Sequence, residues 1–118
     1  MNTALKRARA ALYAFTVPVY LAEFLATDDD GLLILPSDKS FVVLHAITAV
    51  PTFEWGTYSF DDNRIQVNAF SRVEGTAMAL LDAAKPLLAA AKFRPGITTN
   101  LGRDGPYTGA SQDWEVNT

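Results

Sequence analysis

The chain has 118 residues, 49% of them apolar and 19% charged, and its formal net charge is −3. This length suits one compact domain over residues 1–118, and the slight acidic excess does not fit a polycationic nucleic-acid coat. The absence of cysteine excludes disulfides, thiolate metal sites and cysteine nucleophiles. His45 is the single histidine, which excludes any zinc site that needs two imidazoles.

The N-terminal region superficially resembles a secretory signal, because three basic residues precede an apolar run over residues 10–22. Pro18 interrupts this run and Glu23 ends it. The run is also shorter than the about 20 apolar residues that a membrane span requires. We therefore expect a cytoplasmic chain without a membrane segment.

The same region predicts a helix over residues 3–14 followed by a strand over residues 16–23. Pro18 favours the strand because it restricts the residue before it to an extended backbone. One face of the expected helix is apolar, with its residues at helical spacing: Leu5, Ala8 and Leu12.

The middle of the sequence is rich in β-forming residues. Residues 41–50 are almost all apolar, as in a central strand that is covered on both faces. Residues 64–70 alternate between apolar and polar, which predicts a strand with one buried face in an antiparallel sheet. A longer connection over residues 51–63 is expected between them, and residues 28–31 and 36–40 have turn compositions.

The second half predicts one long helix and a final strand. Residues 71–74 match a capping box, and the apolar period then continues to residue 91, with a kink or restart expected at Pro86. Residues 94–112 are rich in glycine and proline and predict turns, with one optional strand before the last one. A strand over residues 113–117 should turn two side chains inward: Trp114 and Val116.

Together these elements predict an α+β fold. A mostly antiparallel sheet of four to five strands should carry two helices on one of its faces.

No motif for catalysis or metal binding is present. The sequence contains no G-x-S-x-G, no Walker loop and no G-x-G-x-x-G between a strand and a helix. The acidic turn at Asp28 does not continue as an EF-hand, because the twelfth position is Lys39. Asp61 and Asp62 are adjacent and would point to opposite faces of a strand. We expect no catalytic residue, cofactor or metal ligand, and we expect His45 to be a core or interface residue.

Two groups of residues are candidates for a subunit or partner interface. Four aromatic residues lie in a connection that would normally be polar, where they either close the core or anchor a partner protein: Phe53, Trp55, Tyr58 and Phe60. Three cations at the start of a helix oppose its dipole, so they form either a solvated face or a surface that an acidic neighbour satisfies: Lys6, Arg7 and Arg9. Arg64 and Tyr107 complete the candidate set.

The order of segments resembles one known family. The segments that carry the resemblance are, in chain order, Ala11-Leu12-Tyr13-Ala14, Val17-Pro18-Val19-Tyr20-Leu21, Phe41-Val42-Val43-Leu44-His45-Ala46-Ile47 and Arg64-Ile65-Gln66-Val67-Asn68-Ala69-Phe70-Ser71. An alanine- and leucine-rich helix follows the last of them. This order resembles the tail terminator, or tail-completion, proteins of long-tailed bacteriophages and related prophages. The likeness extends from about Leu5 to Ala91, whereas the apolar segment at residues 32–36 and Pro86 depart from the family pattern.

The resemblance implies a structural virion protein at the head–tail junction, assembled in the host cytoplasm and without enzymatic activity. Such proteins form a ring, usually a hexamer, that caps the head-proximal end of the tail tube and ends its polymerisation. The implied partners are further copies of the chain, the tail tube protein and the head–tail connector or neck proteins. Genomic DNA would pass through the central channel without sequence-specific binding.

Two other functions stay open at this point. The chain could be another head–tail joining protein with a different place in the neck. It could also be a small α+β ligand-binding or enzymatic domain, which would need a polar pocket around His45 with Asp61 or Asp62.

Overall fold

The computed structural model describes residues 3–13, 15–22, 25–31, 34, 38–46, 51–54, 57–60, 64–73 and 75–116. Its two helices are α1 (Thr3–Ala11) and α2 (Thr76–Ala90). The strands are β1 (Val19–Leu21), β2 (Ser40–Ala46), β3 (Pro51–Glu54), β4 (Thr57–Phe60), β5 (Arg64–Ser71), β6 (Phe93–Asp104) and β7 (Tyr107–Val116). Five strands form one sheet in the order β1-β2-β5-β7-β6, and β3 pairs with β4 in a separate two-stranded sheet.

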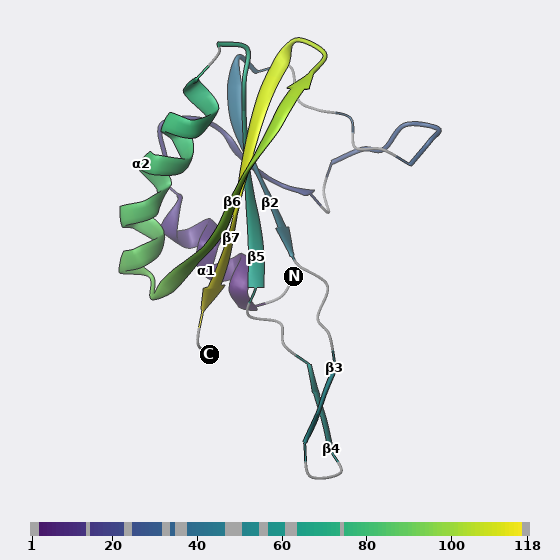
Figure 1. The fold of residues 1–118 in the computed structure, drawn as a ribbon, viewed down its shortest axis with the longest axis vertical. Helices are drawn as coiled ribbons and strands as arrows, with labels where there is room; N and C mark the ends of the chain where they lie inside the picture. The colour runs from purple at the N-terminus through teal and green to yellow at the C-terminus, as the bar shows by residue number, and fades with distance from the viewer. Residues whose placement is uncertain are drawn as a thin grey trace.

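The α+β prediction is confirmed. Only β1 and β2 run parallel, and the other pairs of the five-stranded sheet are antiparallel. Figure 1 shows both helices on the same side of this sheet. The main core lies between the two helices and the five-stranded sheet, as the periodicity of the sequence predicted. Its members include Leu5, Ala8 and Leu12 of α1, Leu80, Leu81 and Leu88 of α2, and Ile65, Val67, Trp114 and Val116 of the sheet.

The helix-free face of the sheet holds a second, aromatic cluster. Phe41 is fully buried there, with its ring centroid 5.2 Å from that of Phe70 and 5.2 Å from that of Tyr107. Tyr20 meets the same ring edge-on at 6.1 Å. The expectation that β5 has only one buried face is therefore wrong, and Asn68 on this second face is only 5% exposed.

The predicted capping box is wrong. Ser71 is the last residue of β5, and its hydroxyl accepts a hydrogen bond from the backbone N–H of Val73 at 3.1 Å. α2 begins only at Thr76, after Gly75 in the left-handed conformation (φ 84°) and without a side-chain cap. Of the two alternatives expected at Pro86, a kink or a restart, the restart is wrong, because α2 continues through Pro86. Pro86 and Asp82, the residue one turn before it, both lie on the exposed face, where water can satisfy the released carbonyl.

The turn-rich stretch over residues 94–112, in which the sequence left one strand optional, forms most of a long hairpin of β6 and β7. β6 is an edge strand, and an edge strand tolerates proline and glycine because one of its sides has no pairing partner. Its pairing with β7 shifts register between Pro95 and Thr98 and again between Asn100 and Gly102. These register shifts let the strand include Pro95, Gly96 and Gly102, whose residue types are typical of a loop. The predicted inward positions of β7 are confirmed, since Trp114 is 2% and Val116 is 0% exposed.

The connection over residues 51–63 contains the β3–β4 hairpin, which the sequence analysis did not predict. Figure 1 shows this hairpin projecting beyond the ends of β2 and β5, away from the five-stranded sheet. The Cα radius of gyration is 14.8 Å, larger than the about 13.5 Å expected for a compact domain of this length. Residues 47–50 of the predicted strand over 41–50 lie outside the described part. Among the described residues no helix is long and apolar enough to cross a membrane.

Candidate interaction surface

The β3–β4 hairpin contains three of the four aromatic residues that the sequence singled out. In its backbone register Phe53 lies opposite Tyr58, and Pro51 lies opposite Phe60. Trp55, between the two strands, lies outside the described residues.

The outer side of α1 combines positive charge with an exposed aromatic ring. Lys6, Arg7 and Arg9 are all exposed, and none of them forms an ion pair with another described residue. The inner side of the same helix is buried in the core. Tyr13, just after the helix, is 92% exposed. Tyr13 is not among the predicted interface residues. Its position in the sequence gives one signal, because the residue that follows Leu12 cannot lie on the same apolar helix face as Leu12.

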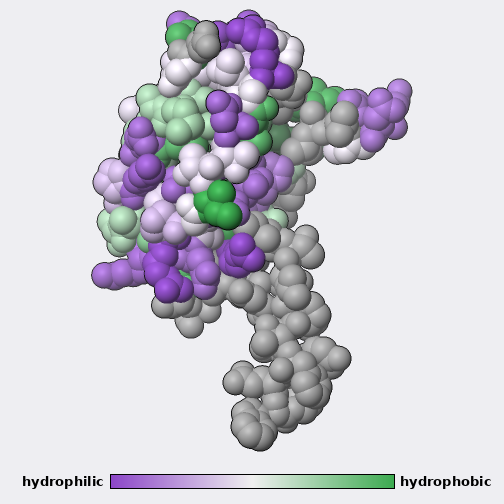
Figure 2. Space-filling view, in the orientation of Figure 1, coloured by the Kyte–Doolittle hydropathy of each residue, from purple (hydrophilic) through white to green (hydrophobic). Residues whose placement is uncertain are grey.

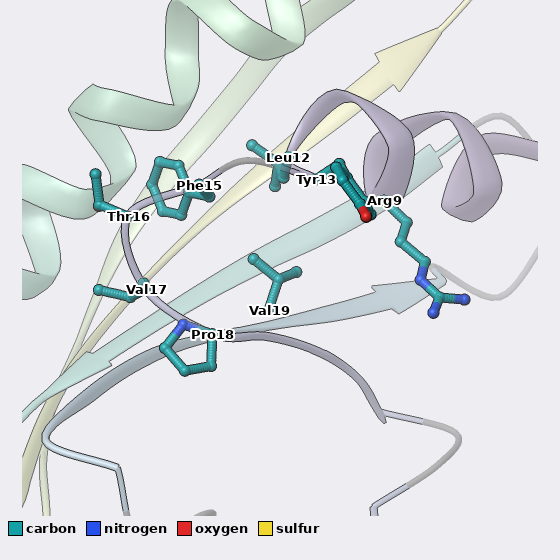
Figure 3. A pocket seen from close by; sticks show the side chains of 8 residues that line it. All are labelled: Arg9, Leu12, Tyr13, Phe15, Thr16, Val17, Pro18 and Val19. Atoms are coloured by element: carbon teal, nitrogen blue, oxygen red, sulfur yellow. The ribbon is translucent and has the colours of Figure 1, made fainter.

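Four residues on the outer side of α1 and just after it form a stripe, which we call the cationic stripe. Lys6, Arg9, Ala10 and Tyr13 are spaced three or four residues apart, which places them on one face of a helix, and they line a shallow groove of about 330 Å³. A neighbouring groove of about 450 Å³ begins at Arg9 and Tyr13 and continues along residues 15–19 (Figure 3). In Figure 3 the side chain of Arg9 extends away from the apolar side chains of this second groove. The outer side of α1 thus offers apolar surface bordered by cations.

A third, polar region lies at one end of the helix-free face. Arg64, the first residue of β5, is exposed and lines a groove of about 310 Å³ with Arg94, Asp113 and Glu115. Arg94 and Glu115 form an exposed ion pair at 3.2 Å. Figure 2 shows a mostly hydrophilic surface on the side turned to the viewer, with small, separate apolar spots. This region offers hydrogen-bonding groups rather than an apolar anchor.

Tyr107, a predicted interface residue, is buried in the single chain, with its side chain only 4% exposed. Its hydroxyl donates a hydrogen bond to the backbone carbonyl of Asp38 at 2.8 Å. The guanidinium of Arg72 lies 5.2 Å from the centroid of its ring. Tyr107 therefore fastens the loop before β2 to the sheet. The sequence could not reveal this role, because the contact joins residues 69 apart.

His45 is half-buried near the end of β2, opposite Gln66 of β5, and burial lowers its pKa from 6.5. The folded chain consequently binds a proton at His45 less readily than the unfolded chain does. The stability that neutral His45 provides is complete above pH 6.5 and is lost as the pH falls from there towards the lowered pKa.

We expect His45→Gln to remove this part of the pH dependence. Urea unfolding of both proteins above and below pH 6.5 tests it. The wild type should lose more stability on acidification than the variant. Equal losses in both proteins would contradict the burial of a neutral imidazole at this position.

The described part of the chain contains no group of three or more histidine and carboxylate side chains that could hold a metal ion. Comparison with protein-family models and with curated proteins gives no match for this chain. The candidate interaction surfaces of the described residues are the β3–β4 hairpin, the cationic face of α1 and a polar groove beside Arg64.

Proposed function

We propose that the chain is a structural subunit of a long-tailed phage or prophage particle. Its copies would form a ring, most simply a hexamer, on the head-proximal end of the tail tube. This ring would end tube polymerisation and present a surface to the head–tail connector. The resemblance over Leu5–Ala91 is the source of the proposal, and the surface chemistry of the domain is compatible with it.

One observation carries the proposal furthest. The β3–β4 hairpin forms its own two-stranded sheet, apart from the five-stranded sheet. An isolated two-stranded hairpin is marginally stable in water, so a partner surface that covers the hairpin would stabilise it. A projecting element of this kind suits a protein that acts by assembly.

The separation of charge on the chain favours a ring over a symmetric dimer. The cations of α1 and the carboxylates of residues 51–63 belong to different segments of the sequence, so a contact between these segments would join unlike patches of two copies. Repeated contacts between unlike patches generate closed rings or open filaments. Six copies would carry a formal charge of about −18, six times the −3 of one chain. A negatively charged channel wall would let DNA pass without adhering to it.

The proposal is tested with the tail tube protein of the same phage or prophage. Tubes are polymerised with and without the chain, and a labelled chain is localised by electron microscopy. We expect label at one end of each tube and no growth from that end. Label along the tube wall, or unhindered growth from both ends, would contradict the terminator function. A ring that binds connector proteins but not tube ends would instead support the neck-protein alternative.

A further inference from the structure

We propose that an acidic turn of one copy docks on the cationic stripe of α1 in a neighbouring copy. The acidic turn consists of residues 28–31, which contain three consecutive aspartates. The stripe consists of Lys6, Arg9, Ala10 and Tyr13, and Arg7 is exposed on the same helix. The occupant of the stripe is a second copy of this chain. This inference rests on the proposed ring and names two surfaces that join its subunits.

The acidic turn is closed by hydrogen bonds of its own backbone. The N–H of Gly31 donates to the carbonyl of Asp28 at 3.0 Å, and the N–H of Asp30 donates to Oδ1 of Asp28 at 2.9 Å. Gly31 has a φ of 81°, a left-handed conformation that favours glycine. A further bond at 2.8 Å, from the N–H of Ile34 to the carbonyl of Ala26, closes the base of the turn. The three exposed aspartates are therefore presented together.

The charges of the two surfaces are complementary. Residues 25–31 contain three carboxylates and no lysine or arginine. α1 has the opposite composition, with three cations and no acidic residue over residues 3–11. Neither these cations nor Asp29 and Asp30 form an ion pair with another described residue. Each surface lacks the counter-charge that the other would bring.

The position of the cations adds a reason for docking. Lys6 lies in the first half of α1, and the first turn of this helix contains no acidic residue. Positive charge near a helix N-terminus opposes the helix dipole. Carboxylates from the acidic turn of a neighbour would offset this repulsion.

The two surfaces do not meet within one copy. In Figure 1 the acidic turn projects to the right of the sheet, whereas α1 lies at the lower left. Figure 2 shows the same projection ending in a hydrophilic tip. A contact between the acidic turn and the cationic stripe therefore joins unlike patches of two copies, and repeated contacts of this type can close a ring.

The dimensions and the apolar parts of the two surfaces also match. Lys6 and Arg9 are three residues apart, about 4.5 Å along the helix axis. The ends of a β-turn lie less than about 7 Å apart, so one turn can meet both cations. Ile34, at the base of the turn, is 52% exposed, and Tyr13 of the stripe is 92% exposed. A DNA backbone would meet the cations but leave Ala10 and Tyr13 uncovered, so the groove favours a protein partner.

Exchange of the charges between the two surfaces tests the docking. The turn variant carries Asp29→Lys and Asp30→Lys, and it keeps Asp28 because that side chain accepts a hydrogen bond within the turn. The helix variant carries Lys6→Glu and Arg9→Glu. Each variant places like charges on both surfaces, so we expect either to raise the concentration for half-maximal ring formation about a hundredfold. All four residues are exposed, so the unfolding temperature of the isolated chain should change by no more than about 2 °C.

Mixing the two variants should restore the ring. In an alternating arrangement each lysine-bearing turn meets a glutamate-bearing helix, and each native turn meets a native helix. A chain that carries all four changes should also assemble, because its charges are complementary again. The matched control reverses two exposed cations elsewhere, in Lys85→Glu and Arg103→Glu. It has the same net charge as the helix variant, and we expect it to assemble like the wild type.

The outcomes separate the docking contact from the function. Rings formed by both single-surface variants at wild-type concentrations would overturn the docking contact and leave the proposed function standing. Failure of both the mixture and the four-fold variant to assemble, with every protein folded, would also overturn the contact. A wild-type chain that forms no ring, alone or on tube ends, would overturn the proposed function together with it.

Two further results would replace the acidic turn by another occupant. If the helix variant fails to assemble but the turn variant assembles like the wild type, the turn is overturned as the occupant in favour of the carboxylates of residues 51–63. If the wild type binds double-stranded DNA and the helix variant loses this binding while its rings are unchanged, the stripe is a DNA contact and the docking is overturned.

Discussion

Replacing Phe41 by alanine is expected to lower the free energy of unfolding by about 4 kcal/mol. The Phe41 side chain is 0% exposed and lies at the centre of the aromatic cluster on the helix-free face. It contacts three rings, those of Tyr20, Phe70 and Tyr107. Removing it leaves a cavity in addition to the lost transfer free energy, and it removes several aromatic pairs. For a chain of this length the unfolding temperature should fall by about 15 °C.

Tyr13→Ala is the matched control for this prediction. Tyr13 is also aromatic but 92% exposed, so its removal should shift the unfolding temperature of the isolated chain by no more than about 2 °C. If Phe41→Ala were tolerated equally well, the helix-free face would not be a second core.

Removing the hairpin is expected to abolish assembly while leaving the domain folded. In this variant residues 47–63 are replaced by a four-residue, glycine-containing turn that joins β2 to β5. The design is feasible because Ala46 already lies opposite Ile65 in an antiparallel pair, which a short turn can close. Since the core between the helices and the sheet keeps all its members, the unfolding temperature should change by only a few degrees. Light scattering should detect monomer at every concentration.

The single substitution Trp55→Ala is the milder form of the same experiment. The aromatic-anchor hypothesis predicts a folded monomer for it as well. A hairpin-free chain that still forms rings would show that assembly uses other surfaces, such as the β6 edge with its exposed Ile97 and Leu101. A hairpin-free chain that unfolds would contradict the view that the hairpin lies outside the domain core.

The parts of the fold that the sequence predicted are those in which one residue pattern has a single simple explanation. The alternation over residues 64–70 and the period of α2 each define one buried face, and the main core has those faces. The composition of β6 is ambiguous by contrast. Its proline and its two glycines are typical of a loop, and only the place of β6 at the sheet edge makes them acceptable in a strand. Edge position depends on the topology, which local sequence does not encode.

The second buried face could not be predicted for a related reason. Phe41, Phe70 and Tyr107 come from three strands and meet only after the order β2-β5-β7 has formed. The capping box failed because Ser71 satisfies the backbone of a turn at the end of β5 instead of the first turn of α2. A tertiary contact, the 2.8 Å hydrogen bond to the hydroxyl of Ser40, also holds Ser71 in the sheet.

The candidate interaction surface was predicted in composition but not in form. The sequence indicated an aromatic group at residues 53–60 and a cationic group at the first helix. The structure adds that this aromatic group lies in an antiparallel hairpin, in whose register Phe53 is opposite Tyr58. No sequence pattern distinguishes Tyr13 from the apolar residues around it. In the structure its side chain is 92% exposed, and it lines the same groove as Lys6 and Arg9.

The function that we propose for the chain depends on its assembly into a ring. Its most direct test is the solution mass of the purified protein, measured by light scattering at several concentrations with and without the tail tube protein. We expect a species of about six subunits, or a monomer that becomes such a ring on tube ends. A chain that stays monomeric at every concentration and leaves the tubes unaffected would contradict the proposed ring.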